Sequence, residues 1–172
     1  MNWRDRIEKN SPRERASLLW AAVIALLVVI LDQWTKWYFI RNYELGGSTP
    51  ILPGVLNFTY VQNIGAAWSM LSGKVWLLLL FGIAAGAAII YFFRKLAEGC
   101  VERYYALLLV ISGIIGNSFD RAFHGAVIDF IHVHYYESWH YPVFNVADMA
   151  ICIGVFIYLI SGFCRKSPEA EK

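Results

Sequence analysis

Two aspartates stand in apolar stretches of the sequence, where a charge has no local explanation. Asp129 lies inside the run VIDFI, and Asp148 follows nineteen residues later, near the start of the apolar segment FNVADMAICIGVFIYLI. Two carboxyl groups that meet within a few ångströms do not ionise easily together, so one keeps a proton and the other acts as a base. Such a pair can activate a water molecule and protonate a leaving amine. Spacing alone does not bring the two together, and an aspartyl dyad is the catalytic hypothesis.

Other polar residues occur near the same ends of the apolar segments. Asp32 and Lys36 are four residues apart and can pair on one face of a helix. Asn145 is placed to cap the helix that carries Asp148 by accepting from amides of its first turn. We predict one polar cluster assembled from all parts of the chain, and its members besides the two aspartates are Asn63, Gly65, Ala66, Asn117, Arg121, Asn145, Asp32, Lys36 and Asp120.

Each of these residues also has a structural interpretation. The Asp32–Lys36 pair can serve only to lock its helix, and Asp120 is expected to be structural, with the neighbouring Arg121 nearer the substrate. Asp148 alone would be explained by the helix dipole, because an acid is favourable in the first turn. No such reason exists for Asp129 in the middle of an apolar run.

The histidines offer a different chemistry. All four lie between residues 124 and 140, and His132 and His134 would share one face of a strand. Two imidazoles and Asp129 are possible zinc ligands, but the spacing matches no strong zinc motif. We therefore interpret the histidines as amphipathic residues at the membrane interface, and the sequence indicates no cofactor.

The composition predicts an integral membrane protein. Of the 172 residues, 58% are hydrophobic and only 16% are charged, against roughly 25% charged in a soluble domain. The net charge of +2 and the scattered basic residues give nucleic-acid binding no support. The three cysteines suggest free thiols and no disulfide framework.

Four apolar windows are long enough to cross a bilayer, which takes about 20 residues. They are residues 16–38, 75–93, 104–123 and 145–164, within a single membrane domain that spans 1–172. Eleven of the 15 basic residues fall in the tails 1–15 and 165–172 and in the loop between the second and third windows, counting Arg103 at its end. Because cytoplasmic loops are rich in Lys and Arg, both termini are predicted to be cytoplasmic. The segments 39–74 and 124–144 then face outward.

The two outer segments carry strand signals. VLNFTYVQ (55–62) is rich in β-forming residues, and residues 127–133 alternate apolar and polar side chains. We expect short strands in both segments, at the outer surface of the membrane.

The motifs LDQWTK, QNIGAAWS, SGIIGNSFDR, VIDFI and FNVAD, in this order across the four apolar windows, closely resemble lipoprotein signal peptidase (signal peptidase II). The resemblance runs from about residue 20 to 163. It implies an aspartic endopeptidase of the bacterial inner membrane, with four transmembrane helices and a small extracytoplasmic β-cradle.

The resemblance also implies the substrate and the site. The substrate would be a diacylglyceryl-modified prolipoprotein, cleaved just before the lipidated cysteine near the outer face of the membrane. Asp129 and Asp148 would form the catalytic pair, the polar cluster would line or support the site, and no metal would take part. Besides the substrate, membrane lipids would be the partners of a monomeric protein.

Two other functions stay open at this point. Acids and asparagines inside a membrane also mark ion pathways, as in a small transporter or a proton-conducting protein. Polar groups confined to one end of the helices argue against a continuous pathway. A non-catalytic assembly factor that binds lipidated peptides is the second alternative.

Overall fold

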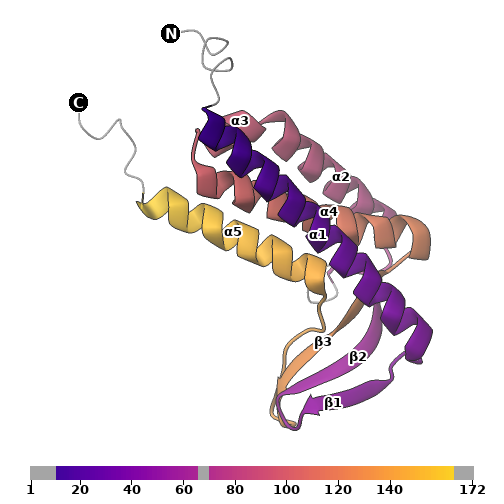
Figure 1. The fold of residues 1–172 in the computed structure, drawn as a ribbon. Coiled ribbons are helices and arrows are strands. Elements are labelled where there is room, and N and C mark those ends of the chain that lie inside the picture. The colour runs from indigo at the N-terminus through magenta and orange to yellow at the C-terminus, as the bar shows by residue number, and fades with distance from the viewer. Residues whose placement is uncertain (1–10, 66–69, 165–172) are drawn as a thin grey trace.

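The computed structural model describes residues 11–65 and 70–164. In chain order, the elements of these residues are α1 (Pro12–Asn42), β1 (Ser48–Leu52), β2 (Leu56–Asn63), α2 (Val75–Tyr91), α3 (Phe93–Ala97), α4 (Val101–His124), β3 (Val127–Tyr135), β4 (Trp139–His140) and α5 (Val146–Cys164). The long helices form a bundle, and the sheet extends from one end of it (Figure 1). Helix α4 packs against α1, α2 and α5 and is the centre of the bundle.

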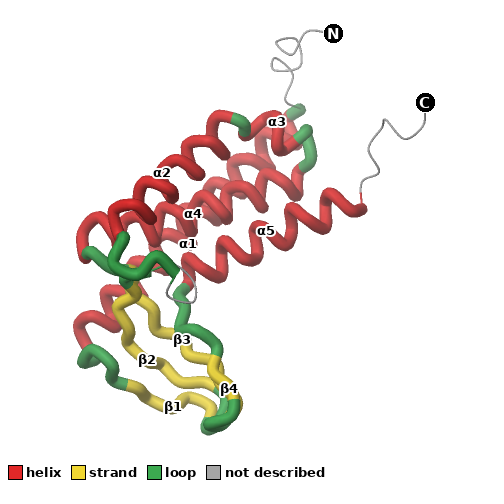
Figure 2. Tube along the Cα trace, turned by 180° about the vertical axis from the view of Figure 1, so that it is seen from behind, coloured by secondary structure: helices red, strands yellow, loops and turns green. Residues whose placement is uncertain are grey.

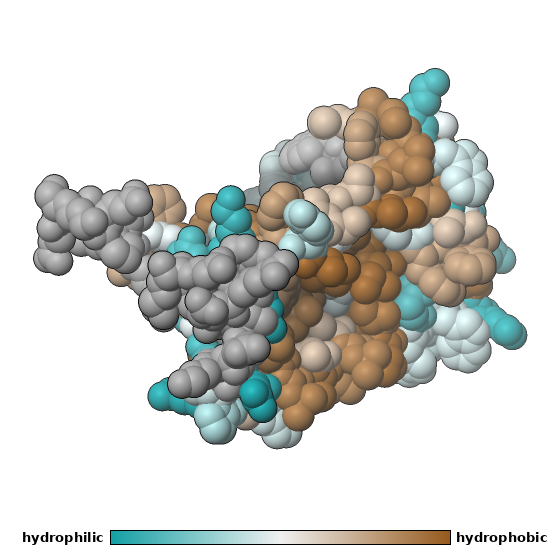
Figure 3. Space-filling view, turned by 90° about the horizontal axis from the view of Figure 1, so that it is seen from above, coloured by the Kyte–Doolittle hydropathy of each residue, from teal (hydrophilic) through white to brown (hydrophobic). Residues whose placement is uncertain are grey.

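The four apolar windows are helical, as predicted. Helices α1, α4 and α5 are long and apolar enough to cross a membrane, whereas α2, at 17 residues, is a shorter apolar helix. The second window was predicted to reach residue 93, but α2 ends at Tyr91 and the short α3 follows. Hydrophobic residues occupy much of the helical surface in the view of Figure 3. The exposed apolar side chains suit contact with lipid.

The outer segments contain the predicted strands and two further ones. Strands β2 and β3 cover the two strand-like runs, and the described sheet is antiparallel in the order β1-β2-β3-β4 (Figure 2). Strand β1 was missed because Pro50 was interpreted as a turn signal. It stands instead in an edge strand, where a missing N–H is tolerated.

The connection from α4 to β3 fixes where Asp129 lies. Gly125 follows the last residue of α4 with φ +68°, a left-handed conformation that ends a helix at little cost for glycine. The chain therefore turns directly into β3. An aromatic cluster joins this strand to the end of α1, with Phe39 and Phe130 stacked at 4.4 Å between ring centroids.

Close packing of α5 on α4 predicts the effect of a single methyl group. A Cβ at Gly154 would lie 2.6 Å from the Ala106 carbonyl oxygen and 2.8 Å from a methyl of Val110, whereas Gly162 on the same helix has open space. We expect Gly154→Ala to destabilise the protein by about 1–3 kcal/mol through overpacking. Thermal unfolding in detergent measures the loss. Gly162→Ala is the matched control, and equal melting temperatures for the two variants would contradict this packing.

Candidate active site

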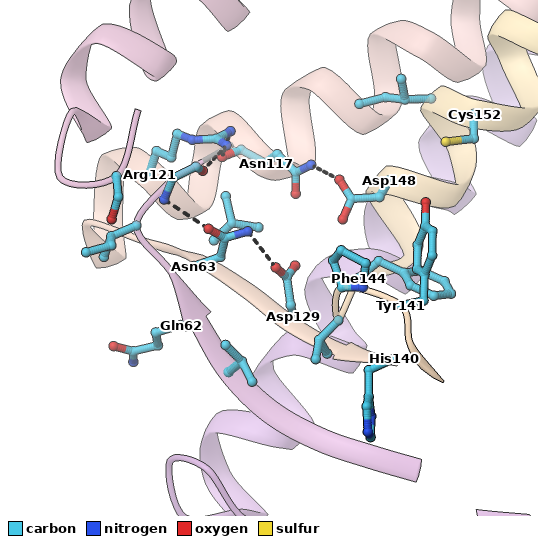
Figure 4. Close-up of a pocket in the computed structure, with 18 residues that line it drawn as sticks. Gln62, Asn63, Asn117, Arg121, Asp129, His140, Tyr141, Phe144, Asp148 and Cys152 are labelled. Atoms are coloured by element: carbon cyan, nitrogen blue, oxygen red, sulfur yellow. Dashed lines mark hydrogen bonds between the residues drawn. The ribbon is translucent and has the colours of Figure 1, made fainter. Parts of the chain in front are cut away.

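A pocket of about 670 Å³ opens where the helices meet the sheet, and it contains both aspartates. Its wall combines residues of β2, α4, β3 and α5 (Figure 4). Six members of the predicted cluster line it: Asn63, Gly65, Asn117, Arg121, Asp129 and Asp148. Residues far apart in the sequence thus supply one concave, polar surface.

Asp129 lies near the start of β3 and is only 2% exposed. Its Oδ1 accepts a hydrogen bond from Asn145 Nδ2 at 2.7 Å, and its Oδ2 accepts from Asn63 Nδ2 at 3.1 Å. Both bonds come from neutral amides. The carboxyl group is therefore held in place by neutral donors, without an ion-pair partner among residues 11–65 and 70–164.

Asp148 lies in the first turn of α5, where Asn145 caps the helix as predicted. Asn145 Oδ1 accepts from the Asp148 backbone N–H at 2.9 Å, and Asp148 Oδ2 accepts from the Asn145 backbone N–H at 3.2 Å. The other carboxylate oxygen accepts from Asn117 Nδ2 at 2.7 Å. These bonds fix the orientation of the carboxylate at the pocket wall.

Asn145 connects the two aspartates directly. Its backbone N–H and side-chain oxygen bond to Asp148, while its amide nitrogen bonds to Asp129. The same nitrogen lies 3.1 Å from Asn117 Oδ1, and the residue is completely buried. One rigid asparagine therefore sets the relative position of the two carboxyl groups.

A buried ion cluster lies behind the asparagines. Lys36 Nζ is 2.8 Å from both Asp32 Oδ2 and Asp120 Oδ2, and it donates to Asn117 Oδ1 at 3.1 Å. All three charged side chains are at most 2% exposed. The pairing predicted from the i,i+4 spacing is confirmed, and Asp120 of α4 completes the cluster.

The same cluster holds the backbone next to each aspartate of the pocket. Asp32 Oδ1 accepts from the backbone N–H of Ala147, the residue before Asp148. Asp120 Oδ2 accepts from the N–H of Ile128, the residue before Asp129. The buried carboxylates thus fix both segments that carry the pocket aspartates, at a distance from the pocket itself.

Gln33 belongs to this network and was missed from the sequence. Its amide nitrogen donates to Asp32 Oδ2 at 3.2 Å and to Asp120 Oδ1 at 3.1 Å. Gly116 leaves room for the Asp32 carboxylate, since a Cβ there would lie 2.5 Å from Asp32 Oδ2. The position of Gln33 beside Asp32 in LDQWTK was the available signal.

Arg121 crosses the pocket from α4 to the loop after β2. Its guanidinium donates to the carbonyl oxygens of Asn117 at 3.4 Å and Gly65 at 3.3 Å. Within the described chain its Nε is buried without a hydrogen-bond partner. Gly65 is held in turn by a bond from its N–H to Asn63 Oδ1. Ala66, which completes the predicted cluster, lies outside the described residues.

The cysteines and histidines were considered above as thiols and as possible zinc ligands. Cys100, Cys152 and Cys164 are free thiols, as predicted, and Cys152 lines the pocket one turn beyond Asp148. In residues 11–65 and 70–164 no three His, Cys, Asp or Glu side chains are placed to hold a metal ion as they stand. Alternation along β3 puts Asp129 on the face opposite His132 and His134, which argues against a zinc site built from these three residues.

The surroundings of Asp129 raise its pKa from 3.8 to about 7. Burial is the main cause, and the charge of Asp148 adds to it, while the hydrogen bonds from Asn63 and Asn145 act in the opposite direction. A carboxyl group that keeps its proton close to neutral pH is suited to donate it in a reaction. The electrostatic effect of Asp148 also couples the titration of the two acids.

Comparison with known proteins shows the family of the chain. The sequence profile described as Signal peptidase (SPase) II matches residues 24–164. The chain belongs to the signal peptidase II family. A lipoprotein signal peptidase of Geobacillus kaustophilus (strain HTA426) is 44% identical over 146 residues, which cover 85% of this chain and 94% of that protein.

Two solved structures have the same fold as this signal peptidase II family member. Both are described as a bacterial membrane enzyme structure determined by the in meso method. The one at 2.3 Å resolution has a TM-score of 0.80 and 36% identity, and covers 88% of this chain and 92% of its own. The one at 1.9 Å has a TM-score of 0.73 and 37% identity, with coverages of 82% and 90%.

Removal of the buried cation tests the ion cluster. Lys36→Met leaves Asp32 and Asp120 without their shared partner, and breaking a buried ion pair in this way costs about 3–5 kcal/mol. We expect a large fall in melting temperature. Lys74→Met, at an exposed position, is the control and is expected to change stability by less than about 0.5 kcal/mol. A Lys36→Met protein as stable as wild type would show that the cluster contributes nothing to the fold.

The raised pKa of Asp129 predicts how stability depends on pH. Folding favours the protonated carboxyl, so its stabilising contribution is complete below about pH 4 and is lost as the pH rises through about 7. Wild type is expected to lose up to about 1.4 kcal/mol per pH unit in this window relative to Asp129→Asn. Unfolding measured from pH 4 to 8 gives the difference. Parallel curves for the two proteins would contradict the raised pKa.

Proposed function

We propose that the protein is an aspartic endopeptidase that removes signal peptides from diacylglyceryl-modified prolipoproteins by cleaving before the lipidated cysteine. The observation that carries the proposal is the pair of carboxyl groups in one pocket, joined through Asn145, with the pKa of Asp129 raised to about 7. Membership of the signal peptidase II family gives the reaction and the class of substrate.

The pair supplies both a base and an acid. The ionised carboxylate takes a proton from a water molecule as the water oxygen attacks the scissile carbonyl carbon, and the protonated carboxyl donates to the carbonyl oxygen. As the C–N bond breaks, the protonated carboxyl donates its proton to the leaving amine, and the other carboxylate takes a proton from a hydroxyl of the tetrahedral intermediate as that oxygen becomes the new carbonyl oxygen. The aspartates end with one shared proton, as they began, and no cofactor takes part.

The remaining residues of the site hold the pair and the substrate. Asn63, Asn117 and Asn145 keep the carboxyl groups in place through the bonds described above. Arg121 lines the pocket, and its buried Nε has no partner among the described residues, which makes it the candidate to bind a substrate carbonyl oxygen. Gly65 and Ala66 are small enough to let an extended peptide backbone come close.

The orientation in the membrane is part of the proposal. The start of α1 and the end of α5 lie at the end of the bundle away from the sheet (Figure 1). The excess of Lys and Arg in the tails and in the loop after α2 supports a cytoplasmic location for that end. Helix α2 is proposed as the fourth membrane crossing, since its 17 apolar residues are at the short limit for a span. The sheet and the pocket would then lie at the extracytoplasmic surface, where lipid chains of the substrate can stay in the bilayer.

A transporter fits these observations less well. The polar groups of the pocket gather at the sheet end of the bundle. A pathway would need to continue to the opposite end of the helices, and membership of a peptidase family favours hydrolysis.

Cleavage of a diacylglyceryl-modified prolipoprotein by purified protein tests the function. Asp129→Asn and Asp148→Asn are each expected to lower the cleavage rate by at least about 100-fold, since each removes an acid–base group of the pair. Cys152→Ala, at another position on the pocket wall, is the matched control and should cleave at nearly the wild-type rate. A chelator should have no effect.

The variants must be folded for the comparison to count, and melting temperatures close to wild type establish this. Substantial cleavage by either folded aspartate variant would overturn the catalytic assignment. Loss of wild-type activity in chelator would point to a metal enzyme instead.

A further inference from the structure

Three of the four histidines gather on one hairpin of the sheet. His132 and His134 lie on the same face of β3, and His140 of β4 pairs with His134 in the antiparallel register. The ring centroids of the three imidazoles are 5.2, 5.3 and 5.6 Å apart. The aspartyl pair does not use this cluster, because Asp129 points to the opposite face of β3.

His134 has a buried ring nitrogen that meets no hydrogen-bond donor among the described residues. Its Nδ1 lies 3.0 Å from the Tyr136 carbonyl oxygen, and a carbonyl only accepts, so Nδ1 carries the ring proton of the neutral side chain. Nε2 is then an acceptor, and within the described chain it is buried with no hydrogen-bond partner. Because unsatisfied buried polar atoms are costly and rare, this nitrogen points to a missing ligand.

The other two rings are spaced like metal ligands. His140 Nδ1 is 3.2 Å from His132 Nε2. Two nitrogens bound to one tetrahedral zinc ion at 2.0–2.1 Å are about 3.3 Å apart. A hydrogen bond between two neutral imidazoles would also explain that distance, but it would leave His134 Nε2 unsatisfied.

The Nδ1 atoms of His132 and His134 make contacts of the kind that metal-binding histidines make with their surroundings. His134 Nδ1 bonds to a carbonyl, and His132 Nδ1 lies 3.5 Å from the Thr59 hydroxyl, which is itself 2.8 Å from the Ser48 hydroxyl. Such contacts fix the ring orientation and tautomer of metal-binding histidines, leaving Nε2 for the ion. The Nε2 atoms are then left for a metal ion, with that of His134 unpartnered among the described residues and that of His132 in contact with His140 Nδ1.

We propose that His132, His134 and His140 bind a divalent transition-metal ion of the zinc or nickel class at the β3–β4 hairpin. Imidazole nitrogen is a preferred donor for these ions. In the described residues the donors are not yet placed around one point, so closure of the site requires the exposed His140 to turn toward His134. His140 also borders the pocket and is followed by Tyr141, Pro142, Val143 and Phe144 on its wall, so a bound ion would tie that wall to β3. In Figure 4 the ring of His140 lies away from the two aspartates.

Calorimetric titration of tag-free protein in detergent with zinc chloride tests the proposal. Wild type is expected to bind one Zn²⁺ per chain in this site, and the ion should raise the melting temperature. His134→Ala and His140→Ala should each weaken the affinity at least tenfold and abolish the thermal shift. His124→Ala is the matched control, because His124 ends α4 outside the cluster, and it should bind like wild type.

His140 is exposed at the end of a two-residue strand, so its replacement is expected to leave the fold of the metal-free protein intact. Wild-type affinity in both His134→Ala and His140→Ala, or no binding to wild type at millimolar zinc, would overturn the proposal. These readouts do not involve peptide cleavage, so their failure would leave the proposed peptidase function standing.

Discussion

The geometry of the site depends on one buried cation. Lys36 lies between Asp32 and Asp120. Each of these carboxylates also accepts a hydrogen bond from the backbone N–H of the residue just before an aspartate of the pocket. Desolvation makes such a cluster expensive, and its attraction offsets the cost only when every charge is paired and hydrogen-bonded. Here Gln33 donates to both carboxylates and Lys36 donates to Asn117, so the charged groups are hydrogen-bonded as well as paired. The ion cluster thus connects α1, α4, β3 and α5 and fixes their relative positions at the site.

The pocket in front of this cluster has the opposite electrostatic character. Asp129 and Asp148 accept hydrogen bonds from asparagine amides and have no ion-pair partner among the described residues. Burial favours the neutral acid and the charge of Asp148 adds to this effect, so the pKa of Asp129 rises although the charge of Lys36 acts in the opposite direction. Four carboxylates are divided in this way, of which Asp148 is half-buried and the other three are almost fully buried. The two beside Lys36 hold structure, and the two in the pocket keep a proton available for chemistry.

Local patterns predicted much of this arrangement, and tertiary packing decided the rest. Alternation over 127–133 indicated β3, the i,i+4 spacing indicated the Asp32–Lys36 pair, and the position of Asn145 indicated its cap of α5; each depends on neighbours along the chain. Strand β1 with Pro50, the bonds of Gln33 to Asp120, and the addition of His140 to the two β3 histidines depend on which segments lie side by side. No local period encodes such contacts. The family motifs located the same residues without giving their geometry.

The central claim is that Asp129 and Asp148 titrate as a coupled pair. Infrared difference spectroscopy of the protonated carboxyl C=O stretch, with Asp129→Asn to assign the band, measures it directly. The predicted result is a band for Asp129 that disappears with a midpoint near pH 7 in wild type. In Asp148→Asn the midpoint should move to lower pH, because the neighbouring charge is gone. A wild-type midpoint near the ordinary carboxyl pKa, or one that Asp148→Asn leaves unchanged, would contradict the account.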